Sequence, residues 1–345
     1  MNERRDVALS ELTTLRLGGP ARRVLTATSV EDIVEAVREV DAAGDRLLVL
    51  GGGSNLVAPD EGFAGTVVLI HSRGIAVQTE DCSGATITVA AGEPWEVLVA
   101  QAVESGWVGM EALAGIPGLT GATPIQNVGA YGQDVSQSVA RVRTWDREAE
   151  AVRTFAGSDC GFGYRHSRFK GSARWVVLEV TFQLALGSLS APVHYGELAQ
   201  RLGVAIGERA PLAEVRGAVL ELRAAKGMVL DADDHDTWSA GSFFTNPVLT
   251  SESAQRLPAA APRFPDGPGR VKTSAAWLIE QAGYGRGYGT GPARLSTKHT
   301  LALTNRGGAR TADLLALARE VRAGVRDRFG VELVNEPVLL DATLD

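Results

Sequence analysis

Apolar residues in the first seventy positions recur with two different periods, one typical of helices and the other typical of strands. Positions 33, 34, 37 and 40 share one face of a helix, which Ser29 and Asp32 begin as a capping pair and Gly44 ends. Continuous apolar runs at 46–50 and 66–70 predict strands, with the glycine-rich residues 51–55 between them. This part of the chain therefore predicts a small unit of mixed helix and strand.

The same patterns predict further elements of both kinds along the chain. Strands are expected at 75–78, 85–90, 139–145, 175–184 and 331–340, and helices at 94–106, 209–227, 274–282 and from 311 onward. The periodicity is lost between 112 and 132, where glycine, proline and other small residues dominate. Such a stretch is typical of a loop that wraps around a ligand.

The composition is that of a globular protein with an excess of glycine. The 345 residues fit two or three domains, and 45% of them are hydrophobic while 22% are charged. Glycine supplies 40 of the 345 residues, or about 12%, against an average of roughly 7%. We therefore expect many backbone positions to need a positive φ or a close approach to another group.

Charge and cysteine content argue against several classes of function. The net charge is −7 and no segment gathers the Lys and Arg that phosphate-backbone binding requires, so we expect no nucleic-acid partner. Cys82 and Cys160 can form no disulfide framework and lack metal-binding spacing, so we expect a reducing cytoplasm and no metal. Residues 1–6 are charged and lead into no apolar run, so no secretory signal is expected. The uncharged residues 112–133 contain five glycines and two prolines, so they predict no membrane helix.

Two glycine-rich segments are candidates for a ligand site. Residues 51–55 follow a strand and offer successive N–H groups to a pyrophosphate, although a simple tight turn has the same composition. The GK[ST] ending of a P-loop is missing, and no GxGxxG occurs in the chain. Residues 115–132 are more specific, because small residues let the backbone approach a large flat ligand while Gln126 and Asn127 add amide groups. A structural crossover loop is the alternative interpretation of this second segment.

Three other positions are candidates for catalysis. Arg165 stands in a run of cations, and a guanidinium suits a carboxylate or an enolate, although spacing alone slightly favours a solvated strand end. Ser242 lies between a glycine and two phenylalanines without a GxSxG elbow, which indicates a structural serine or a proton-donating hydroxyl. Glu336 lies in an apolar run, where it points to solvent or meets a cation. Four isolated cations are each typical of a surface: Lys226, Lys272, Lys298 and His299.

These blocks, in this order, resemble the UDP-N-acetylenolpyruvoylglucosamine reductases, flavin enzymes that make the muramic acid nucleotide of bacterial cell-wall precursors. The resemblance covers nearly the whole chain and rests on residues 14–19, 51–55, 116–132, 164–170, 240–247, 272–283, 296–299 and 335–337. Residues 193–196, Val-His-Tyr-Gly, are similar to the tyrosine loop of the subgroup that carries an insertion in its second subdomain.

The resemblance implies an α+β fold, the FAD-binding fold of the vanillyl-alcohol-oxidase type, with a third α+β domain for the substrate. The first FAD-binding subdomain would comprise residues 1–72 plus 330–345. The second would comprise residues 73–222 with the tyrosine loop, and the substrate-binding domain would comprise residues 223–329.

The resemblance also implies roles for single residues. Arg165 and Glu336 would flank the reacting double bond, and Ser242 would be the acid. The residues that would bind non-covalent FAD are Gly51, Gly52, Gly53, Ser54, Asn55, Leu56, Gly115, Ile116, Pro117, Gly118, Gly121, Ala122, Thr123, Gln126, Asn127, Gly129, Ala130 and Tyr131. Those that would bind the substrate are Tyr164, Tyr195, Lys226, Asn246, Lys272, and Lys298 or His299.

The implied reaction is the NADPH-dependent reduction of UDP-N-acetylglucosamine enolpyruvate to UDP-N-acetylmuramate. A hydride would pass from flavin N5 to the methylene carbon, and Ser242 would give a proton to C2 while Arg165 stabilises the negative charge. We expect a monomer. Two alternatives remain open: an oxidoreductase of the same fold that acts on an alcohol, and a sensor that binds flavin or a nucleotide sugar without catalysis.

Overall fold

The computed structural model describes the backbone of residues 1–345 and every side chain except those of residues 80 and 81. The chain forms two compact units, and each unit is assembled from separate segments. The first unit comprises Met1–Val7, Ala21–Gly52 and Ala64–Ala225, and the second comprises Ala8–Pro20, Gly53–Phe63 and Lys226–Asp345. Residues 51–55 are therefore divided between the units. The expected division into three subdomains stays a prediction.

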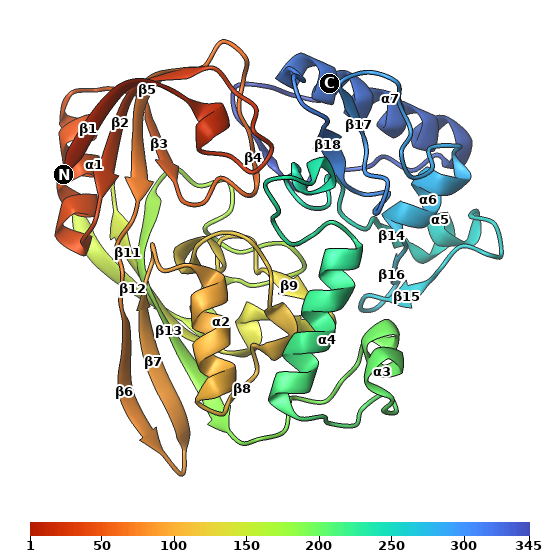
Figure 1. Ribbon diagram of the computed structural model, residues 1–345, viewed down its shortest axis with the longest axis horizontal. Coiled ribbons are helices and arrows are strands. Elements are labelled where there is room, and N and C mark those ends of the chain that lie inside the picture. The colour runs from red at the N-terminus through yellow and green to blue at the C-terminus, as the bar shows by residue number, and fades with distance from the viewer. The chain divides into compact units, whose positions relative to one another are not determined.

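The first unit contains a four-stranded sheet with one helix from the N-terminal part of the chain (Figure 1). The strand order is β1-β2-β5-β3, with β1 (Asn2–Ala8), β2 (Pro20–Ala27), β3 (Leu47–Leu50) and β5 (Phe63–Ile70). Helix α1 (Val30–Ala42) begins after Ser29, whose side chain accepts the N–H of Asp32 at 3.0 Å. The predicted helix and both predicted strands are confirmed. β1 was not predicted, because Val7 is its one buried residue and no apolar alternation marks it.

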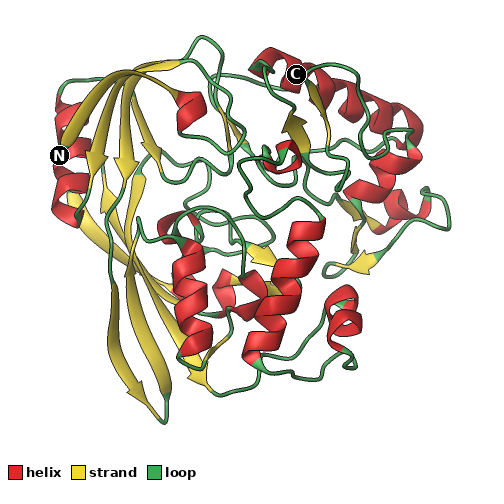
Figure 2. Cartoon of the chain, in the orientation of Figure 1, coloured by secondary structure: helices red, strands yellow, loops and turns green.

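The second sheet of this unit is antiparallel and has the strand order β12-β11-β13-β7-β6, with β8 paired to β13. Its strands are β6 (Ile75–Asp81), β7 (Gly84–Ala90), β8 (Trp107–Val108), β11 (Val139–Asp146), β12 (Ala151–Ala156) and β13 (Trp175–Leu186). Helices α2 (Trp95–Glu104), α3 (Gly196–Leu202) and α4 (Leu212–Ala225) belong to the same unit; they are labelled in Figure 1, and helices are red in Figure 2. The strands and helices predicted in this region are confirmed, with α4 beginning three residues later than expected.

The segment from 109 to 138 contains only short elements, as its composition predicts. These are η2 (Glu111–Leu113), η3 (Thr120–Ala122), β9 (Gly129–Ala130), β10 (Gln133–Asp134) and η4 (Val135–Gln137). Strands β9 and β10 pair with each other in antiparallel register. The backbone of this segment is therefore held by turns and side chains rather than by a long sheet or helix.

The second unit is built around a separate hydrophobic core that includes Phe243, Phe244 and the apolar face of α7 (Thr311–Phe329). Its other helices are η1 (Leu9–Glu11), η6 (His235–Thr237), α5 (Ser251–Gln255) and α6 (Ala275–Gln281). Its strands are β4 (Leu56–Val57), β14 (Val248–Thr250), β15 (Phe264–Pro265), β16 (Arg270–Lys272), β17 (Ala293–Leu295), β18 (Leu303–Asn305) and β19 (Val338–Leu339). β19 runs parallel to β4, so the end of the chain pairs with residues 56–57.

One prediction for the C-terminal region needs correction, and a second one is confirmed. The expected strand at 331–340 is wrong, because only Val338–Leu339 pair as a strand and Asn335 makes a single bridge to Phe244. Residues 334 and 336 are bonded to residues 243–245, and residues 338 and 340 are bonded to residues 55–57, so the run is divided between two partners. The helix from 311 is confirmed, with Arg310 as its N-cap and the Asp313 carboxylate accepting the Arg310 N–H at 2.8 Å.

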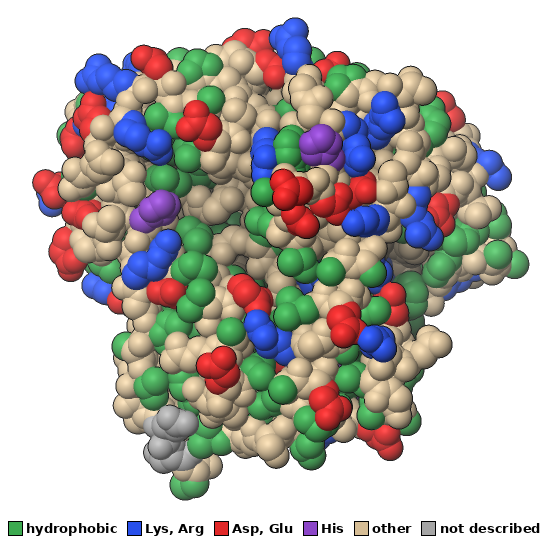
Figure 3. Space-filling model, in the orientation of Figure 1, with side chains coloured by type: hydrophobic (Ala, Val, Ile, Leu, Met, Phe, Trp, Pro, Cys, Tyr) green, Lys and Arg blue, Asp and Glu red, His purple; other side chains and the backbone are tan. Residues whose placement is uncertain are grey.

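The molecular surface carries both signs of charge. On the face in Figure 3, Lys and Arg side chains are interspersed with Asp and Glu. Cys82 is exposed and Cys160 is buried, and both are free thiols. Among the residues that the structure describes, no helix is both long and apolar enough to cross a membrane.

Candidate flavin and substrate site

The two glycine-rich segments predicted to bind a ligand meet backbone to backbone in the first unit. A Cβ atom added to Gly52 would lie 3.0 Å from the Cα of Gly118, and one added to Gly51 would lie 3.4 Å from Leu119 Cδ1. The carbonyl of Gly118 accepts the N–H of Trp95 at 3.1 Å, which ties this loop to the start of α2. The close approach explains why glycine occupies these positions, since a side chain at Gly52 would press against the facing backbone.

The next part of the 115–132 segment is fixed against the end of β7. The N–H of Gly121 donates to the carbonyl of Ala91 and that of Thr120 to the carbonyl of Glu93, both at 2.8 Å. An added Cβ on Gly121 would lie 2.5 Å from Ala91 Cβ, which is closer than two carbon atoms can approach. Ile116, Pro117 and Gly118 are half-buried, so the loop between these anchors is accessible.

Arg165 contacts this same segment from the tip of a tight turn. Gly163 and His166 exchange backbone hydrogen bonds of 3.0 and 3.2 Å, and Arg165 between them has a left-handed φ of 51°. Its Nη2 donates to the carbonyl of Gly129 at 2.7 Å. A left-handed arginine is strained by about 1–2 kcal/mol, and such strain is concentrated at functional sites.

Asn127 connects the turn of Arg165 to the predicted flavin segment. Its Nδ2 donates to the carbonyl of Gly163 at 3.1 Å, and its Oδ1 accepts the N–H of Ser136 at 3.0 Å. The residue is buried and has a φ of 48°. Its side chain therefore positions the Arg165 turn, and a direct contact with a cofactor stays a prediction.

Three tyrosines lie around this segment. The rings of Tyr131 and Tyr195 meet edge to face with their centroids 5.2 Å apart. Burial raises the pKa of Tyr131 to about 12, against the opposing effect of the Arg223 charge. Tyr195 is 44% exposed and Tyr164 is 40% exposed, so both rings are accessible to a ligand. The structure thus brings the tyrosine loop to the 115–132 segment.

In the second unit, the segments of Ser242 and Glu336 lie side by side. Phe244 and Asn335 form an antiparallel bridge, and the N–H of Glu336 donates to the carbonyl of Phe243 at 2.8 Å. Asn55 joins them, because its Nδ2 lies 3.4 Å from the carbonyl of Glu336 and its own carbonyl accepts the N–H of Val338 at 2.9 Å. Three sequence blocks that are far apart along the chain therefore meet here.

Asn246 and Lys272 occupy one corner of the second unit. The Oδ1 of Asn246 accepts the N–H of Ala275 at 3.0 Å, at the first turn of α6. Strands β14 and β16 pair so that Lys272 lies opposite Val248. Val248 follows Asn246 by two residues in the sequence. The side chain of Asn246 thus fixes the start of α6. The sequence predicts this helix but not the role of Asn246 in it.

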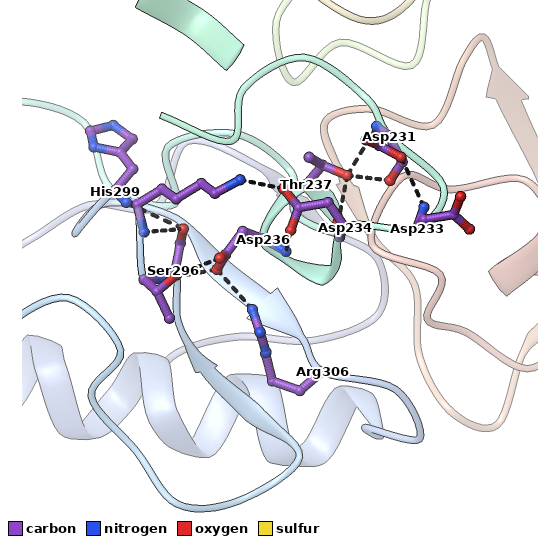
Figure 4. Close-up of polar contacts among 10 residues, drawn as sticks. Asp231, Asp233, Asp234, Asp236, Thr237, Ser296, His299 and Arg306 are labelled. Atoms are coloured by element: carbon purple, nitrogen blue, oxygen red, sulfur yellow. Dashed lines mark hydrogen bonds and ion pairs between the residues drawn. The ribbon is translucent and has the colours of Figure 1, made fainter. Parts of the chain in front are cut away.

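Lys298 and His299 belong to a polar cluster with the acidic residues 231–236 (Figure 4). Lys298 Nζ lies 2.6 Å from a carboxylate oxygen of Asp234, and this pairing raises the pKa of Lys298 and lowers that of Asp234. Ser296 Oγ accepts the N–H groups of Lys298 at 3.0 Å and His299 at 3.2 Å. Lys298 is thus paired with a carboxylate, while its side chain stays 40% exposed, as expected of a cation at the surface.

Asp236 is the buried centre of this cluster. It is 4% exposed and accepts the N–H of Thr297 at 2.9 Å and a guanidinium N–H of Arg306 at 2.7 Å. Desolvation alone would raise the pKa of Asp236, but the hydrogen bonds from the hydroxyl and N–H of Thr297 and from Ser296, together with the charge of Arg306, lower it. Sequence analysis missed Asp236, although the run Asp-Ala-Asp-Asp-His-Asp at 231–236 is a signal that could have found it.

The predicted site residues divide between the two units. The first unit holds Gly51 and Gly52, the 115–132 segment, and the side chains of Tyr164, Arg165 and Tyr195. The second unit holds residues 53–56, Ser242, Asn246, Lys272, Lys298, His299 and Glu336, with Lys226 as the first residue after α4. In the first unit the printed contacts join the 115–132 segment to Arg165 and Tyr195, and in the second they join the segments of Ser242, Glu336 and Asn55.

The first unit has the features that a flavin nucleotide needs. The backbone of Gly51 and Gly52 faces the backbone of the accessible loop at 116–119. No side chain lies between Gly52 and Gly118. Successive backbone N–H groups of this kind are suited to a pyrophosphate, and small residues leave room for a flat ring system. The residues present therefore fit FAD.

Comparisons with known proteins agree with this geometry. Residues 21–154 match the model of an FAD binding domain, and residues 233–340 match that of a UDP-N-acetylenolpyruvoylglucosamine reductase C-terminal domain. The UDP-N-acetylenolpyruvoylglucosamine reductase of Thermobifida fusca is 56% identical over 99% of this chain and 98% of its own length. That of Streptomyces coelicolor is 57% identical over 100% of this chain and 92% of its own length.

A solved structure extends the agreement to the fold. The crystal structure of UDP-N-acetylenolpyruvylglucosamine reductase from Thermus caldophilus is 27% identical, with a TM-score of 0.66 over 98% of this chain and 99% of that one. The expected α+β, FAD-binding fold class is thereby confirmed. On these grounds the chain belongs to the UDP-N-acetylenolpyruvoylglucosamine reductase family.

Proposed function

We propose that this protein reduces UDP-N-acetylglucosamine enolpyruvate to UDP-N-acetylmuramate with NADPH, a reaction of peptidoglycan precursor synthesis. Membership of the family makes it an FAD-dependent oxidoreductase. The observation that best supports the substrate is the pairing of the Ser242 segment with the Glu336 segment beside Asn55. A hydroxyl and a carboxyl group on adjacent backbones suit a substrate that must receive a proton beside its own carboxylate.

FAD, held by the glycine-rich segments 51–55 and 115–132, would supply the hydride transfer from NADPH to the enolpyruvyl group of the substrate. The protein must then stabilise negative charge that spreads over C2 and the carboxylate. Arg165 is suited to this role because a planar guanidinium binds two carboxylate oxygens at once. Its bond to the carbonyl of Gly129 uses Nη2 and fixes the direction of the side chain. Groups preorganised in this way contribute about 3–4 kcal/mol to the transition state.

Ser242 is the proposed proton donor to C2. The hydroxyl is half-buried and directly precedes Phe243 and Phe244, which are both buried in the core of the second unit. The backbone around it is fixed, because Phe243 donates to the carbonyl of Leu301 at 2.7 Å and accepts from Glu336. A fixed donor suits proton transfer, which typically contributes roughly 10²–10⁴-fold to the rate. Glu336 is proposed to hold the substrate carboxyl group beside it.

The polar residues of the second unit are proposed to bind the nucleotide part of the substrate. Lys298 is a cation at neutral pH and can pair with a phosphate, and its ion pair with Asp234 fixes the direction of its side chain. The remaining residues proposed to contact the substrate are Lys226, Asn246, Lys272, His299, Tyr164 and Tyr195.

Four further properties, concerning location and partners, complete the proposal. We propose that the enzyme works in the cytoplasm, where its two free cysteines would stay reduced. We also propose that it is a monomer, binds no nucleic acid and does not attach to a membrane. The net charge of −7 supports the absence of nucleic-acid binding, since a phosphate backbone would be repelled.

A steady-state assay tests the proposal. The purified holoprotein is mixed with NADPH, and absorbance at the NADPH band is followed before and after addition of UDP-N-acetylglucosamine enolpyruvate. The proposal predicts slow oxidation without the sugar nucleotide and rapid oxidation with it, one NADPH for each substrate molecule. Denaturation should release free FAD. Oxidation driven instead by a simple alcohol donor, or FAD that stays attached to the denatured chain, would contradict it.

A further inference from the structure

We propose that the buried carboxylate of Glu111 is a positioning residue that joins the tyrosine loop (residues 193–196) to the 115–132 segment. The proposal rests on the proposed function, in which these two segments serve substrate and flavin. Glu111 lies in η2, just before the 115–132 segment, and is 0% exposed. A carboxylate withdrawn from water needs strong partners, so its surroundings identify what it does.

Every hydrogen bond that the structure gives the Glu111 carboxylate comes from an N–H group. Oε2 accepts the backbone N–H of Gly109 at 2.7 Å. Oε1 accepts the side-chain Nε2 of Gln133 at 2.9 Å and the backbone N–H of Ala191 at 2.7 Å. These three donors come from three separate parts of the first unit. A single oxygen atom, Oε1, therefore links Gln133 to Ala191.

The Gln133 branch leads to the predicted flavin segment. Gln133 directly follows that segment, and β10 pairs it with Ala130. Its Oε1 accepts the backbone N–H of Ala112 at 2.9 Å while its Nε2 donates to Glu111. With both ends of its side chain engaged, Gln133 fixes the backbone that carries Tyr131 and Gly132.

The Ala191 branch leads to the tyrosine loop. Ala191 lies two residues before Val193, whose N–H donates to the carbonyl of Glu208 at 2.8 Å. Gly207 in turn donates to the carbonyl of Val193 at 2.8 Å. These bonds anchor the loop on the side of residues 207–208, and the bond to Glu111 anchors it toward the 115–132 segment.

The two branches meet again where the tyrosines touch. The rings of Tyr131 and Tyr195 lie 5.2 Å apart, and a Cβ added to Gly132 would be 3.4 Å from the Cβ of His194. Glu111 is thus linked to the segment of Tyr131 through Gln133, and to the loop of Tyr195 through Ala191. The contact between the two rings completes the cycle. The role of Glu111 is to set where the tyrosine loop lies, and this residue does not act on the reacting atoms.

The chemistry of the site explains why the residue is a carboxylate. All three facing groups are donors, and a carboxylate offers only acceptors. A glutamine at 111 keeps one acceptor oxygen for Gln133 and Ala191 and turns its NH₂ toward Gly109, where two donors would face each other. A leucine at 111 leaves all three donors unsatisfied. The leucine variant should therefore weaken the link between the two segments more than the glutamine variant does.

Amide hydrogen exchange tests the link without any assay of activity. In Glu111→Leu we expect the Ala191 amide to exchange at least tenfold faster than in the wild-type holoprotein. The Val193 amide, which donates to Glu208, should change by less than threefold and serves as the internal reference. Glu111→Gln should lie between wild type and Glu111→Leu, and it carries the test if the leucine variant fails to fold. Unchanged exchange at Ala191 in both variants would overturn the proposal.

Kinetics test the consequence for the site. Glu111→Leu should raise the KM for the enolpyruvyl sugar nucleotide at least tenfold, while NADPH reduces the flavin within threefold of the wild-type rate. Glu104→Gln, a change of an exposed glutamate at the end of α2, is the matched control and should leave both values unchanged. An unchanged KM with faster exchange at Ala191 would overturn the positioning role. If the wild type itself does not turn over this substrate, the proposed function fails, and the exchange measurement still decides the link.

Discussion

The backbone N–H of Glu336 donates to the carbonyl of Phe243 at 2.8 Å. This bond places Glu336 directly beside the residue that follows Ser242. The bridge between Phe244 and Asn335 extends the same antiparallel pairing by one residue. The two proposed catalytic groups of the second unit are thus fixed by backbone bonds, which single side-chain substitutions leave in place.

Substitution of Ser242 by alanine should separate the two halves of the reaction. Because the hydroxyl is needed only for protonation of C2, we expect flavin reduction by NADPH to be unchanged and enolpyruvyl reduction to fall by roughly 10²–10⁴-fold. Stopped-flow absorbance of each half-reaction measures this. Ser251→Ala, on the exposed start of α5, is the control. Equal loss in both halves would refute the proposed role of Ser242.

Substitution of Glu336 by glutamine keeps the shape of the side chain and replaces the carboxyl group by an amide, which neither ionises nor gives up a proton. We expect kcat for enolpyruvyl reduction to fall by about 10²-fold, as for the loss of one preorganised group at a developing charge. The flavin half-reaction with NADPH should not change. Glu332→Gln, in the same segment but exposed, is the comparison variant. A Glu336→Gln enzyme with wild-type turnover would remove this residue from the mechanism.

Asp146 should make the first unit sensitive to acid. The Arg174 guanidinium donates to its carboxylate at 2.6 and 2.8 Å and lowers the pKa of Asp146 to about 2. Because the folded pKa lies below the unfolded value near 4, the contribution to stability is full above about pH 5 and is lost as the pH falls toward 2. The thermal midpoint of Asp146→Asn should therefore fall less between pH 5 and 2.5 than that of the wild type. Parallel pH dependence in the two proteins would contradict the assignment.

Two glycine substitutions in the first unit should act in opposite directions. Gly121→Ala puts a methyl group 2.5 Å from Ala91 Cβ, so we expect a loss of about 1–3 kcal/mol and weaker retention of FAD. Gly217→Ala lies within α4 with no atom within 4 Å of the new methyl, so we expect a gain of up to about 1 kcal/mol. Thermal midpoints and the flavin content of purified protein measure both. A flavin content unaffected by Gly121→Ala would count against the close packing of this loop.

Local structure could be predicted from the sequence where its determinants are local. Ser29 and Asp32 begin α1 as expected, because a capping pair and the apolar face that follows it are both contained in a dozen residues. The run at 331–340 was expected to be one strand, but its pairing depends on where Phe244 and residues 56–57 lie. Partners so distant in the sequence are not visible in a local pattern.

In the candidate site, too, features with local determinants could be predicted from the sequence, and features that depend on distant partners could not. The glycine segments were found from composition, since backbone proximity requires glycine at Gly52 and Gly121. Glu111 and Asp236 were missed, because a buried carboxylate looks like any surface acid until its donors are known. Asn127 was predicted to bind the cofactor for its amide group, and the structure uses that amide to hold the turn of Arg165.

The most direct test of the account is an anaerobic experiment with two additions. The holoprotein is first bleached with one equivalent of NADPH, and UDP-N-acetylglucosamine enolpyruvate is then added without oxygen. We predict that the yellow flavin absorbance returns and that one equivalent of UDP-N-acetylmuramate forms. Flavin that stays bleached after the sugar nucleotide is added would contradict the central claim that this protein reduces it.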